Sequence, residues 1–165
     1  MLSRWDMLRS QMLGATVALW LMAPSAAMSE PSALFQELES YFEFVDYGGG
    51  VLFSEQIPRE TWQQLLVIDT RDAAQFAKGH IPGAINIEWR QLVARRSFIP
   101  KSKQVLVYCN TGSLSAQAGL AMRLAGWDNL RILQGGYDEW QAKGGFDAHA
   151  NALKRNNLDS GSQRK

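Results

Sequence analysis

Short apolar runs alternate with helix-like stretches along the middle of this chain, and this alternation most limits the fold. Each run is too short for a helix and is apolar without alternation, as in strands buried on both faces. The predicted strands are Val51–Phe53, Leu65–Ile68, Ala84–Ile87, Val105–Tyr108 and Leu130–Leu133. Strands separated by helices favour an α/β fold, a parallel sheet covered by helices on both faces.

The helix expected after the fourth strand begins close to Cys109 and ends at Gly126. Its apolar residues predict one buried face, formed by Leu114, Ala118, Ala121, Met122 and Ala125. Shorter helices are expected near Pro58, at Asp72–Ala77, at Trp89–Ala94 and after Gly135.

Four segments are predicted along the chain. Residues 1–27 read as a signal peptide, residues 28–50 as a helical extension, residues 51–147 as the compact domain, and residues 148–165 as a polar tail expected to be disordered. The extension contains Leu34, Leu38, Tyr41, Phe42 and Val45 at helical spacing. About 138 residues would remain after cleavage, which suits one domain.

The predicted signal has arginines at its start, an apolar stretch from Met12 to Met22, and small residues up to Ala27. The apolar stretch is about half the ~20 residues of a spanning helix, so we expect cleavage and no stable membrane anchor. An uncleaved anchor is the alternative. The expected location is the periplasm.

Charge and motif content exclude several classes of function. The chain has 17 basic and 16 acidic residues, a balance that gives no support for binding nucleic acid. The glycine pairs match neither a P-loop nor a dinucleotide fingerprint. The two histidines, His80 and His149, form no ligand pair with Cys109 at zinc spacing, so no metal and no cofactor are expected.

Cys109 is the single cysteine and stands where a strand passes into a helix. The free N–H groups at such a junction, together with the helix dipole, stabilise an anion and should favour the thiolate. A lone cysteine is also often a small buried hydrophobe, and both interpretations stay open.

Several segments in order make the chain resemble a single-domain rhodanese. They are Ile68–Arg71, Phe76, Gly79–Ile87, Val107–Cys109, Gly112, Gly126–Trp127 and Leu133–Trp140. The resemblance implies a rhodanese-like, five-stranded parallel sheet flanked by helices. It also implies a catalytic Cys109 that takes sulfane sulfur as a persulfide from thiosulfate or a similar donor and passes it to a thiol or cyanide.

The resemblance places the active loop at Cys109–Leu114, followed by Ser115. We expect the backbone of Asn110, Thr111, Gly112, Ser113, Leu114 and Ser115 to surround the sulfur and bind the substrate, with Gly112 allowing the loop to curl. Leu114 stands where family members often carry arginine, serine or threonine, and it offers no charge to an anionic donor. Ser115 occupies the position of the arginine in CX5R phosphatases and is expected to cap the helix.

Three charged or titratable residues near the predicted site have structural explanations. Asp69 is expected to bond loop N–H groups and Arg71 to pair across the sheet edge, although Arg71 is also the best candidate for a substrate-binding cation. His80 is expected to bond the backbone within its turn.

Three functions remain open from the sequence. The first is a sulfurtransferase that works through a Cys109 persulfide. The second is a sulfur-relay module that receives its sulfur from a protein partner, and the third is a rhodanese-like domain without catalysis that serves only protein contact.

Overall fold

The computed structural model describes residues 32–46 and 48–162, and side chains up to residue 158. The predicted signal peptide, residues 1–27, lies outside the described residues. None of the helices within the described ranges is long and apolar enough to cross a membrane.

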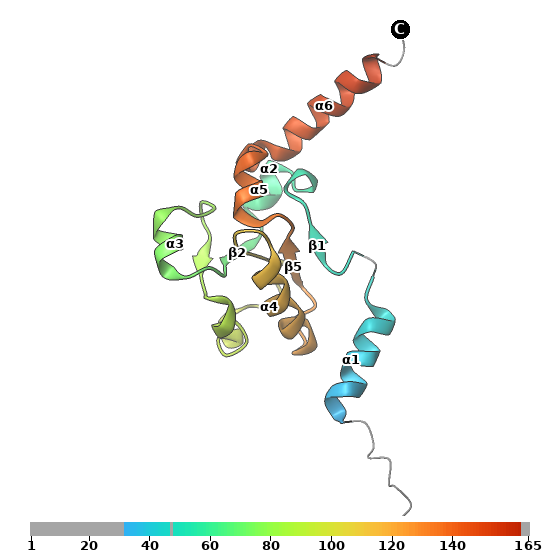
Figure 1. The fold of residues 1–165 in the computed structure, drawn as a ribbon, viewed down its shortest axis with the longest axis vertical. Helices are drawn as coiled ribbons and strands as arrows, with labels where there is room; N and C mark the ends of the chain where they lie inside the picture. Colours follow the sequence, from blue (N-terminus) through green and yellow to red (C-terminus); the bar gives the residue numbers. More distant parts are fainter. Residues whose placement is uncertain (1–31, 47, 163–165) are drawn as a thin grey trace, which may run out of the picture. The chain divides into compact units, whose positions relative to one another are not determined.

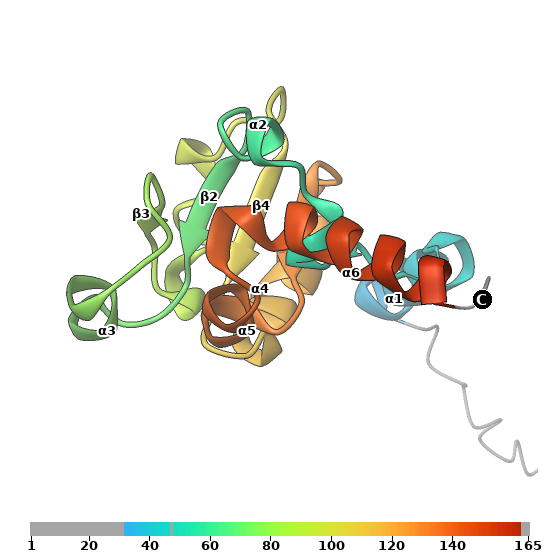
Figure 2. The same ribbon diagram turned by 90° about the horizontal axis from the view of Figure 1, so that it is seen from above.

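Five parallel strands form one sheet, as predicted, and their order in the sheet is β1-β5-β4-β2-β3 (Figures 1 and 2). The strands are β1 (Val51–Leu52), β2 (Leu66–Asp69), β3 (Ile85–Asn86), β4 (Val105–Tyr108) and β5 (Leu130–Leu133). In the central pair, Ile68 of β2 stands in register with Val107 of β4. This register brings the ends of β2 and β4 to one edge of the sheet.

Helices and 3₁₀ turns connect the strands. The α-helices are α1 (Ala33–Phe44), α2 (Arg59–Trp62), α3 (Ala73–Lys78), α4 (Ser113–Leu124), α5 (Gly136–Ala142) and α6 (Ala148–Ser162). The 3₁₀ turns are η1 (Ser54–Gln56), η2 (Trp89–Gln91), η3 (Arg96–Phe98) and η4 (Gly145–Asp147). The helix predicted over Trp89–Ala94 is therefore only a short 3₁₀ turn.

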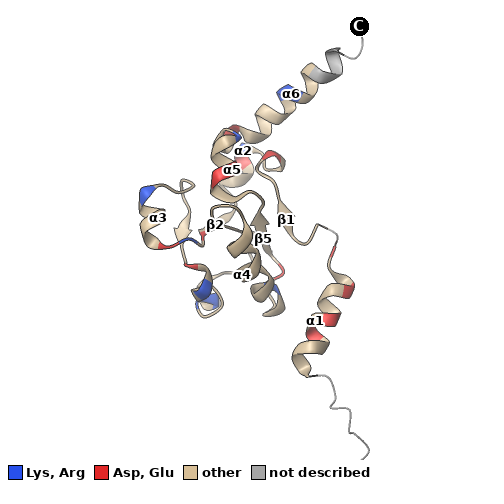
Figure 3. Ribbon diagram, in the orientation of Figure 1, with Lys and Arg blue, Asp and Glu red and all other residues tan. Residues whose placement is uncertain are grey.

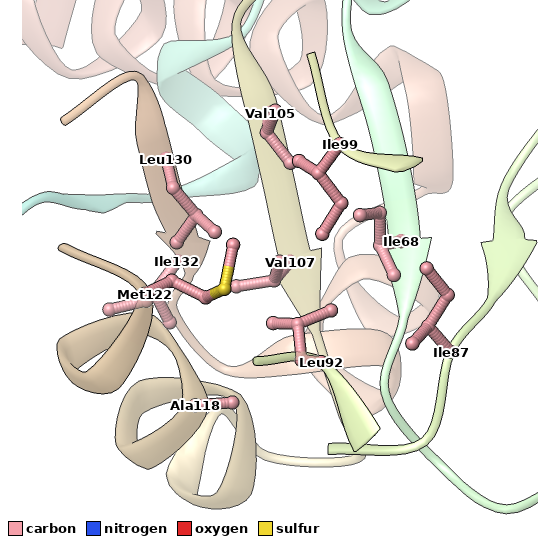
Figure 4. Close-up of a cluster of buried hydrophobic side chains, with 10 residues drawn as sticks. All are labelled: Ile68, Ile87, Leu92, Ile99, Val105, Val107, Ala118, Met122, Leu130 and Ile132. Carbon is pink, nitrogen blue, oxygen red and sulfur yellow. The ribbon is translucent and has the colours of Figure 1, made fainter. Parts of the chain in front are cut away.

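Each face of the sheet carries its own hydrophobic core, because alternate residues of a strand point to opposite faces. Val105 and Val107 of β4 pack with Met122 of α4 on one face (Figure 4). Leu106 and Tyr108 pack with Trp62 and Trp140 on the other face. The two cores account for the apolar character of the strands and hold helices against both faces of the sheet.

The predicted face of α4 is correct at Ala118 and Met122 but wrong at Leu114, Ala121 and Ala125. Its buried residues are Ser115, Ala118, Gly119 and Met122, whereas Leu114 is 39% exposed. Ala121 and Ala125 are also exposed. A Cβ on Gly119 would lie 3.0 Å from Cγ1 of Ile132, so a small residue lets the helix approach the sheet closely. The buried face of α4 therefore includes the small residues Ser115 and Gly119, because the helix packs closely on the sheet, and it does not include Leu114.

The predicted disorder of residues 148–165 is wrong for residues 148–162, which form α6. Ala148 is fully buried, and the side-chain nitrogen of Asn151 donates to the main-chain carbonyl of Lys143 at 3.2 Å. These contacts hold the first turn in place, and ordinary helix formers such as Ala152, Leu153 and Lys154 continue it. Polarity alone had suggested disorder, but α6 needs only its first turn to be anchored.

Candidate active site

Cys109 is the first residue after β4 and is 3% exposed. It lines a pocket of about 410 Å³ together with residues of its own loop and of two other segments. The pocket residues are Thr70, Arg71, Asp72, Gln75, Glu88, Trp89, Arg90, Asn110, Thr111 and Leu114. Although little of Cys109 is exposed, it lies at the wall of an open pocket.

Main-chain N–H groups of the loop surround the sulfur of Cys109. The amide of Gly112 donates to Sγ at 3.2 Å, and the buried hydroxyl of Ser115 lies 3.8 Å from it. Burial raises the pKa of the thiol, but hydrogen bonds from the amides of Ser115, Thr111 and Leu114 lower it. The net result is a pKa below the ordinary value of cysteine, so the loop favours the thiolate.

Gly112 gives the loop its curl. Its φ is +99°, a left-handed conformation that L side chains rarely adopt. A Cβ there would also lie 3.3 Å from the carbonyl oxygen of Leu133. The predicted role of Gly112 agrees with this geometry.

The predicted cap by Ser115 is wrong. Gly112 occupies the N-cap position of α4, and no side chain caps the helix there. The hydroxyl of Ser115 instead donates to the carbonyl of Gly112 at 2.9 Å. Ser115 lies one turn inside the helix, and its side chain is therefore turned back toward the loop and the sulfur.

The start of α5 holds the other side of the loop. The amides of Tyr137 and Asp138 donate to the carbonyls of Cys109 and Asn110 at 2.9 and 3.1 Å. A Cβ on Gly136 would lie 2.4 Å from both of these carbonyl oxygens. Because the carbonyls of the loop bond to α5, its following N–H groups are free to face the sulfur. The support of the loop by α5 was not predicted from the sequence. The Gly135–Gly136 pair directly after β5 is the sequence feature that indicates it.

Arg71 is a buried clamp beside the pocket. Its guanidinium pairs with Asp69 at 2.5 Å, donates to the carbonyl of Gly79 at 2.7 Å, and lies 4.4 Å from the ring centre of Tyr137. The hydrogen bonds to Asp69 raise the pKa of Arg71, which is 6% exposed. Arg71 is paired as predicted, but its partner is Asp69, two residues earlier in the same segment, and not a residue across the sheet edge. Its positive charge is thus already balanced by a carboxylate.

Asn110 ties the loop to α3. Its side-chain oxygen accepts from Arg71 at 3.3 Å, and its side-chain nitrogen donates to Gln75 at 2.8 Å. Thr111 and Ser113 interact with each other through their hydroxyls, 3.2 Å apart, and both are exposed. The six residues predicted to surround the sulfur therefore form one loop beside it. The side chain of Asn110 mainly holds this loop against Arg71 and Gln75.

The remaining charges of the pocket are balanced or negative. Arg90 pairs with Glu88 at 2.8 Å, and Asp72 caps α3 by accepting from the amide of Gln75 at 2.9 Å. Leu114 and Trp89 add apolar surface. The pocket thus contains one activated sulfur, and both of its cations, Arg71 and Arg90, are paired with a carboxylate.

His80 lies outside this pocket and takes the predicted structural role. Its Nδ1 lies 2.9 Å from the carbonyl oxygen of Phe76, and its ring stacks on the ring of Phe76. Within the described ranges, no group of three or more His, Cys, Asp or Glu side chains is arranged to hold a metal ion.

Comparisons with known proteins agree with this geometry. Residues 53–143 match the family model of the rhodanese-like domain. A sulfurtransferase of Allochromatium vinosum is 33% identical over 82 residues, covering 50% of this chain and 77% of that protein.

Two solved structures resemble the fold. A rhodanese-like domain from Anabaena sp. is 29% identical with a TM-score of 0.52, covering 58% of this chain and 76% of that one. A rhodanese-related protein from Thermoplasma volcanium is 24% identical with a TM-score of 0.53, covering 58% of this chain and 93% of that one. The second likeness concerns the fold alone.

Proposed function

This chain belongs to the rhodanese-like domain family, and we propose that it is a sulfurtransferase that carries sulfane sulfur as a persulfide on Cys109. The observation that supports this most is the set of N–H groups directed at Sγ. Such donors stabilise a thiolate and then a persulfide anion without a general base.

The reaction has two steps, written here for thiosulfate as donor and cyanide as acceptor. The thiolate of Cys109 attacks the outer sulfur of thiosulfate, an S–S bond forms on Sγ, and the donor's S–S bond breaks to release sulfite. Cyanide then attacks the terminal sulfur of the persulfide and leaves as thiocyanate. The thiolate is restored, and a thiol acceptor would take the sulfur in the same way.

A second candidate function, relay of sulfur from a protein persulfide, is favoured by the charges of the pocket. Thiosulfate carries two negative charges. Arg71 and Arg90 are each already paired with a carboxylate, and the side chain of Leu114 carries no charge. A persulfide donor needs only its terminal sulfur to be held. We expect thiosulfate to react slowly and an organic persulfide to react faster.

The proposed location is the periplasm, on the basis of the signal-like residues 1–27. Expression of the full chain in a bacterium, followed by separation of periplasm and cytoplasm, tests this. A mature form starting near residue 28 in the periplasmic fraction is the expected result. Retention of the uncleaved chain in the membrane fraction would support the anchor instead.

The intact mass of the protein tests the proposed chemistry. Incubation with thiosulfate, or with a small uncharged alkyl persulfide, should add one sulfur atom, and a later thiol or cyanide should remove it. Cys109→Ala should show no adduct. If no donor adds sulfur to the folded wild-type protein, the chain is a rhodanese-like domain that serves only protein contact.

A further inference from the structure

We propose that residues 90–103, here called the basic segment, dock an acidic protein that exchanges sulfur with Cys109. This inference rests on the proposed function and adds the partner class to it. The segment begins within η2, at Arg90 in the wall of the Cys109 pocket, and faces solvent over most of its length.

The charge of the basic segment is all of one sign. It contains Arg90, Arg95, Arg96, Lys101 and Lys103, with no Asp or Glu. All five are exposed, and Lys101 lies 4.4 Å from the ring centre of Trp127. Among the described residues only Arg90 of these five pairs with a carboxylate. Figure 3 shows basic residues on these turns, below and to the left of α4. Four cations of the segment are therefore unpaired. Arg95 and Arg96 follow Arg90 of the pocket wall, whereas Lys101 and Lys103 precede the start of β4, at the other edge of the sheet from Cys109.

The segment leaves the pocket wall through tight turns. The amide of Arg95 donates to the carbonyl of Gln91 at 2.9 Å, and the amide of Phe98 donates to the carbonyl of Arg95 at 3.0 Å. Leu92 lies toward the end of β4 and Ile99 toward its start at Val105 (Figure 4). The segment thus runs from the Cys109 end of the sheet back along the same face.

An aromatic side chain stands among these charges. Phe98 is 77% exposed and comes two residues after Arg96 in sequence, while Val93 is 36% exposed. Aromatic and arginine side chains dominate the binding energy of many protein interfaces. The segment therefore offers both an apolar contact and a charge that selects an acidic surface.

The chemistry selects a protein over other polyanions. Sulfur passes from a donor persulfide only when the donor's terminal sulfur touches Sγ of Cys109. The thiolate attacks that sulfur, a bond to Sγ forms, the donor's S–S bond breaks, and the donor leaves as a thiolate. Nucleic acids and phospholipids carry no thiol, whereas an acidic protein can carry a cysteine persulfide to the pocket.

Two synthetic peptides test the docking. Each contains one cysteine loaded as a persulfide, flanked by glutamates in one peptide and by glutamines in the other. We expect the acidic peptide to load Cys109 about tenfold faster than the neutral peptide at low ionic strength, with the difference lost near ~1 M salt. Intact mass against time measures both rates.

Charge reversal locates the effect. Arg95→Glu with Arg96→Glu should abolish the preference for the acidic peptide, and Phe98→Ala should slow both peptides. The control, Lys154→Glu with Arg155→Glu, makes the same charge change on exposed residues of α6, where Arg155 lies 4.0 Å from Glu55, and should keep the preference. A small uncharged alkyl persulfide should load all of these variants at the wild-type rate, which also shows that they are folded.

The outcomes separate this inference from the proposed function. If the alkyl persulfide fails to load the wild-type protein, the proposed function is overturned and the docking with it. If it loads but the two peptides react equally fast, only the docking is overturned. Binding of phosphatidylglycerol vesicles through Arg95 and Arg96, without any preference between the peptides, would assign the segment to a lipid surface instead.

Discussion

Two sets of positively polarised groups surround Cys109, and they differ in whether their charge is already balanced. The amides of the loop, at Thr111, Gly112, Leu114 and Ser115, favour the negative sulfur. The guanidinium of Arg71, beside the same pocket, is paired with Asp69. The site is therefore built to hold the charge of one sulfur atom and has no free cation for a second charge.

Removal of the charge on Asp69 gives the largest expected effect on stability and breaks the balanced half of this comparison. Asp69→Asn leaves the buried guanidinium of Arg71 without a carboxylate, so the free energy of unfolding should fall by about 3–5 kcal/mol. Urea unfolding measures the loss. Glu88→Gln, which breaks the more exposed pair with Arg90, should cost less than about 1 kcal/mol. Equal losses for the two variants would contradict the clamp.

The support of the loop by α5 is tested by Gly136→Ala. The added Cβ meets two carbonyl oxygens, so we expect a loss of about 1–3 kcal/mol in unfolding free energy and a thiol pKa closer to the ordinary value. Gly83→Ala is the control, because Gly83 also has a positive φ but has no atom within 4 Å of the added Cβ. A Gly136→Ala protein with unchanged thiol reactivity would show that α5 does not hold the loop.

The pH dependence of stability tests whether the loop amides favour the thiolate of Cys109. The thiol pKa of Cys109 is lowered in the folded state, so between the folded and unfolded pKa values the unfolded chain binds more protons. The stability of the wild-type protein relative to Cys109→Ala should rise with pH across this interval, just below the ordinary thiol pKa, and be lost as pH falls through the folded pKa.

Unfolding free energies of both proteins at a series of pH values measure this difference. The rate of iodoacetamide labelling against pH gives the folded pKa directly. Parallel stability profiles for the two proteins would mean that the amides do not favour the thiolate.

The smallest expected effect comes from adding the missing cation. Leu114→Arg places a charge without a carboxylate partner at the pocket, and the KM for thiosulfate should fall about fivefold, equivalent to about 1 kcal/mol. Leu114→Gln is the uncharged control and should leave the KM nearly unchanged. An unaltered KM in Leu114→Arg would mean that charge does not limit the use of thiosulfate.

Much of the fold was predictable because it depends on local patterns. The bounds of β4 and β5 agree with their apolar runs, and β2 is displaced by a single residue. The face of α4 was not predictable in this way, since Ser115 and Gly119 are buried for their small size. The helix α6 was missed because one buried residue, Ala148, anchors a segment whose composition is polar.

The sequence by itself determined the parallel α/β sheet and the place of Cys109 at a strand–helix junction with Gly112 in its loop. Both follow from the order of apolar runs and turn residues along the chain. Only the tertiary structure decided that Arg71 is balanced by Asp69 and that α5 holds the loop. These contacts depend on strand register and on how closely helices pack, and neither is written in the spacing of residues along one segment.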